Sequence, residues 1–200
     1  MDRDLVQKLA QKHPIGDRIT ITVDYCCLDR NGESVDMATL RQWQDYGLVE
    51  IVATEAMEEE WDATNPNVKD KLRDQVLRLE KIFPEYPSEI GKAVIGRSAI
   101  GEGGTVRDDK DIYDYCHEFI ELMFPNFASF GQGKKVSSFQ DAMHVSIHYL
   151  FNRDIFLTLD SDFMRNRKKL SEKFDDLHIL TPKECVSLLQ EVFSCSVEGG

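Results

Sequence analysis

The sequence predicts an α/β fold of the three-layer α/β/α kind, with helices covering a central parallel sheet. Three observations predict it. A run of alternating β-branched residues from Ile19 to Asp24 is typical of a strand. A helical pattern and a second strand-type run follow it directly. A late run, 154–160, is again of strand type and again ends on an aspartate. Strands that alternate with helices along a chain favour a parallel sheet.

The amino-acid composition is typical of a folded, globular protein. The 200 residues suit one domain with a full hydrophobic core, and 36 acidic against 24 basic side chains give a net charge of −12. Hydrophobic residues make up 42% of the chain, which excludes a disordered acidic tail. No apolar run reaches the roughly 18–20 residues of a membrane span, and the charged N-terminus lacks a signal-peptide pattern. We therefore expect a soluble, cytoplasmic protein without a membrane partner.

The five cysteines form no CxxC pair. An odd number without a secretion signal predicts free thiols in a reducing compartment. We expect them to be buried small hydrophobic residues.

The first part of the chain reads as β-α-β-α after a short helix within 1–16. The strand at 19–24 is followed by a helix over 35–46, with Gly47 as its C-terminal cap. A second strand covers 48–53. Thr54 is the expected N-cap of an acidic helix over 55–61.

The rest of the chain is mostly helical by pattern. A polar amphipathic helix is predicted over 67–83, an apolar helix over 111–124, and a loop from Gly131 to Lys135. A largely buried helix over 138–151 leads into the strand at 154–160. A basic helix over 162–174 and a short strand at 177–180 follow. Thr181, Pro182 and Glu184 have the spacing of a capping box and predict a last helix to about 193.

Four acidic residues are expected at one edge of the sheet. Ligands of open α/β sheets bind outside the carboxyl ends of the strands, and two strands end on Asp24 and Asp160. Asp141 begins the buried helix over 138–151, and Glu60 faces inward if the helix over 55–61 packs on the core. Clustered carboxylates repel one another unless a cation compensates, and Mg²⁺ or Mn²⁺ takes such ligands. Each residue alone is also explained as a turn former or a helix cap.

The C-terminal part of the sequence resembles the second half of a PIN domain. The likeness lies in Asp-Ala at 141–142 opening a buried helix, in Thr158-Leu159-Asp160-Ser161-Asp162-Phe163 closing a strand, and in Thr181-Pro182-Lys183-Glu184. In the first half, Val23-Asp24 and the stretch 54–61 are compatible with the family. The resemblance covers about 19–61 and 136–194. It implies a single PIN-like domain over 1–200, with a helical insertion at about 62–135.

What the resemblance implies is a metal-dependent endoribonuclease. Asp24, Glu60, Asp141 and Asp160 would hold Mg²⁺ or Mn²⁺, and Asp162 would be a further ligand or orient a water. Glu58 or Glu59 could replace Glu60, because three consecutive glutamates leave the register open. The chain departs from the family at Tyr25-Cys26-Cys27, where members usually have a small polar residue and an asparagine. Thr158 either bonds a site carboxylate or water, or is simply a strand former.

Basic residues flank these acids in the sequence. Lys134, Lys135 and the four cations of 165–169 would suit contacts to the RNA backbone, or they belong to a solvated helix face. His144 and His148, four residues apart, could chelate a metal. In a buried helix, packed and hydrogen-bonded histidines are the favoured interpretation.

Other functions fit less well or remain open. A haloacid-dehalogenase phosphatase needs Asp-x-Asp after its first strand, whereas here that spacing closes a late one. No phosphate-binding glycine motif occurs. The alternatives are a catalytically degenerate PIN scaffold that binds RNA or a protein, and a toxin held by an antitoxin-like partner. A homodimer is expected by resemblance alone.

Overall fold

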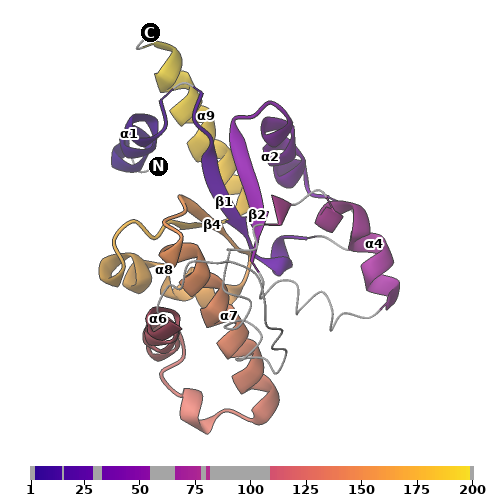
Figure 1. Cartoon of the computed structure of the whole chain (residues 1–200), viewed down its shortest axis with the longest axis vertical. Coiled ribbons are helices and arrows are strands. Elements are labelled where there is room, and N and C mark those ends of the chain that lie inside the picture. Colours follow the sequence, from indigo (N-terminus) through magenta and orange to yellow (C-terminus); the bar gives the residue numbers. More distant parts are fainter. Residues whose placement is uncertain are drawn as a thin grey trace.

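The computed structural model describes residues 3–14, 16–28, 33–54, 66–77, 80–81 and 109–198. Figure 1 shows their arrangement. The strands are β1 (Ile19–Val23), β2 (Val49–Ala53), β3 (Glu80–Lys81), β4 (Ile155–Leu157) and β5 (Ile179–Leu180). The α-helices are α1 (Arg3–Lys12), α2 (Val35–Asp45), α4 (Pro66–Leu77), α6 (Asp109–Met123), α7 (Gln132–Leu150), α8 (Ser161–Lys173) and α9 (Pro182–Glu198). Two 3₁₀ turns are η1 (Tyr25–Cys27) and η2 (Phe127–Ser129).

The strands form a parallel sheet in the order β3-β2-β1-β4-β5. The register pairs Ile21 of β1 with Ile51 of β2 on one side and with Ile155 of β4 on the other. The strands β2 and β3 therefore lie on one side of β1, and the later strands β4 and β5 lie on its other side. The parallel sheet predicted from the sequence is confirmed.

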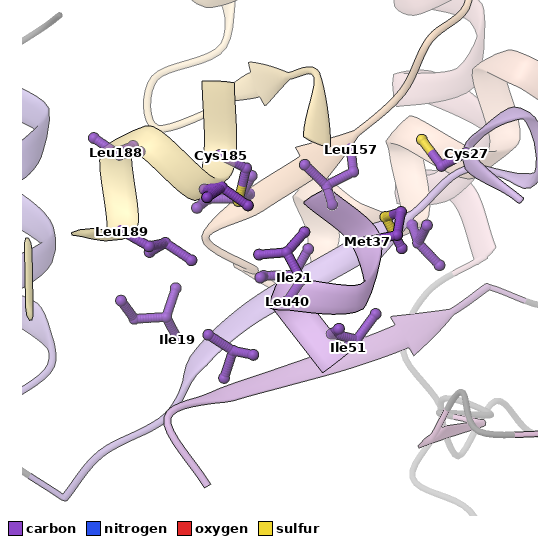
Figure 2. Close-up of a cluster of buried hydrophobic side chains, with 14 of the residues drawn as sticks. Ile19, Ile21, Cys27, Met37, Leu40, Ile51, Leu157, Cys185, Leu188 and Leu189 are labelled. Carbon is purple, nitrogen blue, oxygen red and sulfur yellow. The ribbon is translucent and has the colours of Figure 1, made fainter. Parts of the chain in front are cut away.

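One core cluster lies between the sheet and helices α1, α2 and α9. Because side chains of a strand alternate between faces, Ile19, Ile21 and Val23 of β1 all point to this side. Figure 2 shows Ile19 and Ile21 among side chains of α2 and α9, including Leu40 and Leu189. The periodic apolar residues of these helices are the reason that they pack on this face.

A second core cluster lies between the other face of the sheet and helices α6, α7 and α8. Phe156 of β4 points to this side, opposite to its neighbours Ile155 and Leu157. Phe119 of α6 stacks on Phe174 at the end of α8, with ring centroids 4.1 Å apart. Buried apolar residues on both sides of one sheet are consistent with a three-layer α/β/α fold. None of the described helices is long and apolar enough to cross a membrane.

The segment 62–135, predicted as an insertion, contains α6, which belongs to the second core. Cys116, Phe119 and Met123 of α6 are buried there. The division of the domain into a core and an insertion stays a prediction.

Two local signals in the sequence are confirmed. Gly47 has a φ of +72° and ends α2 in a Schellman motif: its N–H donates to Gln44 O (2.9 Å) and the next N–H, of Leu48, donates to Trp43 O (2.9 Å). At α9, Thr181 N–H donates to Glu184 Oε2 (2.9 Å) and Glu184 N–H donates to Thr181 Oγ1 (3.2 Å), which is a capping box.

Two predictions of local structure are wrong. Residues 131–135 are not a loop, because Gly131 is the N-cap of α7 and Lys135 N–H donates to its carbonyl (3.0 Å). Glycine is accepted at an N-cap, so its presence did not mark a loop. Residues 80–81 do not continue α4 but pair with Val52 and Ala53 of β2, since tertiary pairing overrides the helical preference of charged residues. The helix predicted over 55–61 lies outside the described residues.

A buried carboxylate fixes the edge of the sheet where β1 begins. Asp154 accepts hydrogen bonds from Thr20 N–H (2.7 Å), from Thr20 Oγ1 (2.7 Å) and from Lys12 Nζ (2.7 Å), and it lies 2.9 Å from His13 Nε2. Burial raises the pKa of Asp154, whereas these hydrogen bonds lower it. The hydrogen bonds have the larger combined effect, so the pKa of Asp154 lies below the usual value. Asp154 thus joins α1, β1 and β4.

Candidate functional site

The candidate site lies at the carboxyl edge of the sheet, where the strand order reverses between β1 and β4. Asp24 directly follows β1 and Asp160 follows β4 by three residues. A crevice outside the strand ends at such a reversal is the usual ligand position in open α/β sheets. The two strand-end aspartates predicted from the sequence therefore flank this position.

Asp24 is held rigidly in the edge of the sheet. Its side chain and backbone are almost fully buried, with 6% of the residue exposed. Its N–H donates to Leu157 O (2.8 Å), which continues the ladder between the two strands by one residue. Oδ2 accepts hydrogen bonds from Thr158 Oγ1 (2.6 Å) and Cys26 Sγ (3.1 Å). Within the described part of the chain, Oδ1 has no such partner and stays available to a ligand.

The hydroxyl of Thr158 joins the two aspartates. It donates to Asp24 Oδ2 and accepts from the Asp160 N–H (2.9 Å). Thr158 is fully buried, and its own N–H donates to Leu180 O of β5 (3.0 Å). The predicted hydrogen bond from Thr158 to a carboxylate of the candidate site is confirmed. Thr158 also continues the hydrogen-bond ladder between β4 and β5.

Asp160 also caps α8. Its Oδ1 accepts from the Asp162 N–H (2.5 Å), so the helix-cap explanation of this residue is correct. The cap uses one carboxylate oxygen. Oδ2 of the half-buried side chain has no hydrogen-bond partner among the described residues. Capping fixes the carboxylate in place and does not exhaust its capacity as a ligand.

Asp162 is engaged with two cations. Oδ2 lies 3.3 Å from Lys134 Nζ, and Oδ1 accepts from Arg165 Nη2 at 3.0 Å. Lys134 comes from the first turn of α7, and its Nζ also lies over the Phe124 ring, 5.4 Å from the centroid. With an ion pair on each carboxylate oxygen, Asp162 holds basic groups beside the site. This arrangement does not favour the predicted role of a metal ligand.

Asp141 does not begin a helix, contrary to the prediction, because α7 begins nine residues earlier, at Gln132. It occupies a mid-helix position and shares a helix face with His144 and His148 at i+3 and i+7. His148 reaches Thr22 within β1, and His144 reaches Thr54 just past β2. One turn further towards the N-terminus of α7, the same face carries Asp141.

Both histidines are packed and hydrogen-bonded, as the favoured interpretation predicted. Nδ1 of His144 bonds Thr54 Oγ1 (2.5 Å), and Nδ1 of His148 bonds Thr22 Oγ1 (2.9 Å). Burial lowers the pKa of His148 to about 3. Burial also lowers the pKa of His144, and the nearby negative charge of Asp24 opposes this effect. Both rings are neutral at pH 7. Within the described part of the chain, neither Nε2 has a hydrogen-bond partner.

The described residues alone do not complete a metal centre. Among them, no group of three or more His, Cys, Asp or Glu side chains is close enough together to hold an ion. Glu60 and its alternatives Glu58 and Glu59 lie outside the described residues. The oxygens at the edge, from Asp24 and Asp160, are the hard donors that Mg²⁺ and Mn²⁺ prefer. The donor chemistry fits these ions, but Asp24, Asp141 and Asp160, which are all described, do not form such a group.

Cys26 and Thr54 contact site residues in ways that sequence reasoning did not assign. Besides its bond to Asp24, the exposed Cys26 accepts a hydrogen bond from the Leu159 N–H at Sγ (3.0 Å). All five cysteines are free, as predicted, but Cys26 and Cys195 are exposed, so burial was wrongly expected for them. No periodicity signals a contact between residues 26 and 159. A polar residue at a strand end, such as Thr54, can be recognised from the sequence. Its hydrogen-bond partner on α7, His144, cannot be predicted in that way.

The remaining basic residues have mixed surroundings. Arg167 Nη1 lies 2.8 Å from Glu184 Oε1, and Lys168 Nζ lies 3.8 Å from Glu172 Oε1. Lys169 is exposed and Lys135 is half-buried. Exposed ion pairs of this kind contribute little to stability, so these cations remain accessible to an anionic ligand.

Comparisons of the chain with protein-family models, with curated proteins and with solved structures give no match. The chemistry of the site therefore rests on its own residues.

Proposed function

We propose that the chain is a metal-dependent endoribonuclease of the PIN type. The observation that carries the proposal is the pair of aspartates at the strand-order reversal, joined by the buried hydroxyl of Thr158. Two acidic side chains fixed at the usual ligand position of an α/β sheet are more than turn formers. The parallel sheet with helices on both faces supports the same proposal.

Asp24 and Asp160 would hold Mg²⁺ or Mn²⁺, together with Asp141 and with Glu60 or a neighbouring glutamate. When bound, such an ion lowers the pKa of a coordinated water and stabilises charge on a phosphate. The chain contributes the placement of its oxygens. Thr158 and Cys26 each bond Oδ2 of Asp24, which leaves Oδ1 directed elsewhere, and the cap interaction orients Asp160 in the same way.

Basic side chains beside the carboxylates would receive the RNA backbone. Lys134 from α7 and Arg165 from α8 converge on Asp162, although they are far apart in sequence. Asp162 orients both, and a phosphate could compete for them because the ion pairs are partly exposed. The net charge of −12 opposes indiscriminate RNA binding, so we expect activity to fall steeply with salt.

A second candidate is a catalytically degenerate PIN scaffold that binds RNA or a protein. One observation favours it. Among the described residues no three-ligand metal group forms, and Asp162 is occupied by cations. Such a scaffold would bind RNA through the basic residues but would not cleave it.

Cleavage of single-stranded and structured RNA with Mn²⁺ tests the first proposal. We compare the parent with Asp24→Asn, Asp141→Asn and Asp160→Asn, and use Asp17→Asn as the matched control, since Asp17 is exposed and precedes β1 at the opposite edge. We expect each site variant to lose about 100-fold or more of the activity, and the control to keep it. A chelator should abolish cleavage by the parent.

Equal activity in all four variants, or activity unchanged by a chelator, would contradict the nuclease proposal. RNA binding without cleavage, weakened by Lys134→Glu, would support the scaffold instead. Urea unfolding of each variant separates lost chemistry from lost folding.

A further inference from the structure

A groove of about 640 Å³ runs along the free edge of the sheet beside β5. Its walls come from β5 and from helices α1, α8 and α9. The lining residues are Leu5, Arg167, Lys168, Ser171, Leu177, His178, Ile179, Leu180, Lys183, Glu184, Ser187 and Leu188. None of the aspartates of the candidate site lines this groove, so it is a separate feature of the molecule.

The groove contains the unpaired edge of a strand. Phe156 N–H of β4 donates to His178 O (2.9 Å), and Thr158 N–H donates to Leu180 O (3.0 Å). In a parallel ladder, the peptide groups of alternate residues point to opposite sides. The N–H and C=O of Ile179 therefore point away from β4, towards the groove. Within the described part of the chain, no strand pairs with β5 on this side.

The floor of the groove is aliphatic and its rim is basic. Leucine and isoleucine side chains line the floor, and no Phe, Tyr or Trp lines the groove, although its lining includes the imidazole ring of His178. Lys168 and Lys183 supply the positive charge of the rim, because the charge of Arg167 is offset by Glu184, which also lines the groove. Arg167 already bonds a carboxylate, that of Glu184, at 2.8 Å, which shows that a carboxylate fits at the rim. These features match an acidic extended peptide better than RNA.

The basic rim also argues against a second copy of the chain as the occupant. Edge-to-edge pairing of two β5 strands would bring the same cations together across the interface. The rim stands out in a chain of net charge −12. Opposite charge on a partner gives both attraction and selectivity.

We infer that this groove binds an extended acidic segment of a partner protein, added to the sheet as a further strand beside β5. The peptide backbone pairs with the N–H and C=O of Ile179, a residue that is 5% exposed and has no strand partner on this side among the described residues. On alternate positions, apolar side chains of the segment enter the aliphatic floor, and Asp or Glu side chains meet Lys168 and Lys183.

Fluorescence anisotropy with labelled ten-residue peptides tests the inference on the full chain. In the probe, valine alternates with glutamate; in two matched peptides, lysine or glutamine replaces glutamate. A fourth peptide carries the acidic sequence with N-methylated backbone amides, which cannot pair with a strand. We expect the acidic peptide to bind at least 10-fold more tightly than the other three.

A pair of charge-matched variants locates the binding. Lys168→Glu with Lys183→Glu should weaken the acidic peptide at least 10-fold. The control, Lys135→Glu with Lys169→Glu, changes lysines that do not line the groove and should leave binding unchanged.

Several results would overturn the inference. They are an absence of binding at millimolar peptide, equal binding of the lysine or N-methylated peptide, and equal loss in both double variants. Displacement of the peptide by a uridine oligonucleotide would assign the groove to RNA. Concentration-dependent dimerisation in sedimentation, abolished by the Lys168 and Lys183 changes, would assign it to a second copy.

Discussion

Replacing Thr158 by valine tests the hydrogen-bond link between the two strand-end aspartates. Valine has nearly the shape of threonine, so the fully buried site loses only the hydroxyl. The change removes the 2.6 Å bond to the Asp24 carboxylate and the 2.9 Å bond from the Asp160 N–H. A hydrogen bond to a charged group is worth about 1.5–3 kcal/mol, and an unsatisfied polar group costs about 1–3 kcal/mol. We expect a loss of about 2–4 kcal/mol in the free energy of unfolding, because Cys26 still bonds Asp24.

Urea unfolding monitored by circular dichroism measures this loss. Thr158→Ser is the matched control, since it keeps the hydroxyl and should lose less than half as much. If the valine variant unfolds within about 0.5 kcal/mol of the parent, the hydroxyl does not join the two aspartates in solution. A serine variant as unstable as the valine variant would show that the methyl group, rather than the hydroxyl, matters.

Three further changes probe the rest of the fold. Asp154→Asn should lower the stability at pH 7 by about 2–4 kcal/mol. Because the folded pKa of Asp154 lies below the usual value, its contribution to the free energy of unfolding exists above pH 4 and disappears as pH falls. The variant should lose this acid sensitivity in urea titrations from pH 2 to pH 7. The pKa of His148 is about 3 against 6.5 unperturbed, so the unfolded chain binds the proton first and stability falls as pH drops from 6.5 towards 3. His148→Gln should flatten that fall, which is at most about 1.4 kcal/mol per pH unit; an unchanged slope would contradict the pKa. Gly47→Ala should cost about 1 kcal/mol in thermal unfolding, because φ is +72°, and Gly47→Asn should cost less.

Short-range patterns in the sequence were enough to predict the elements that depend on neighbouring residues. Gly47 ends α2 and Thr181 with Glu184 begins α9, because both motifs bond residues within a few positions of each other. The sequence also predicted β1 from its alternating β-branched residues, and it predicted the aspartates that follow β1 and β4. Parallel strands share one carboxyl edge, so the prediction that Asp24 and Asp160 lie at the same edge needed no tertiary detail.

Elements that depend on contacts with distant segments could not be predicted from short-range patterns. The start of α7 was placed too late, because Gly131 and Gly133 suggested a loop although one of them is an N-cap. That error also misplaced Asp141 at a helix start. The strand β3 exists because Glu80 and Lys81 pair with β2, and nothing local distinguishes them from the preceding helix.

The sequence by itself determined the fold class, the caps and the two acidic strand ends of this protein. Only the tertiary structure decided what those acids touch. It gave Asp24 the hydroxyl of Thr158, and it gave Asp162 the ammonium group of Lys134. Local patterns report the conformation of neighbouring residues, whereas contacts across 28 to 134 positions depend on how the sheet and helices pack.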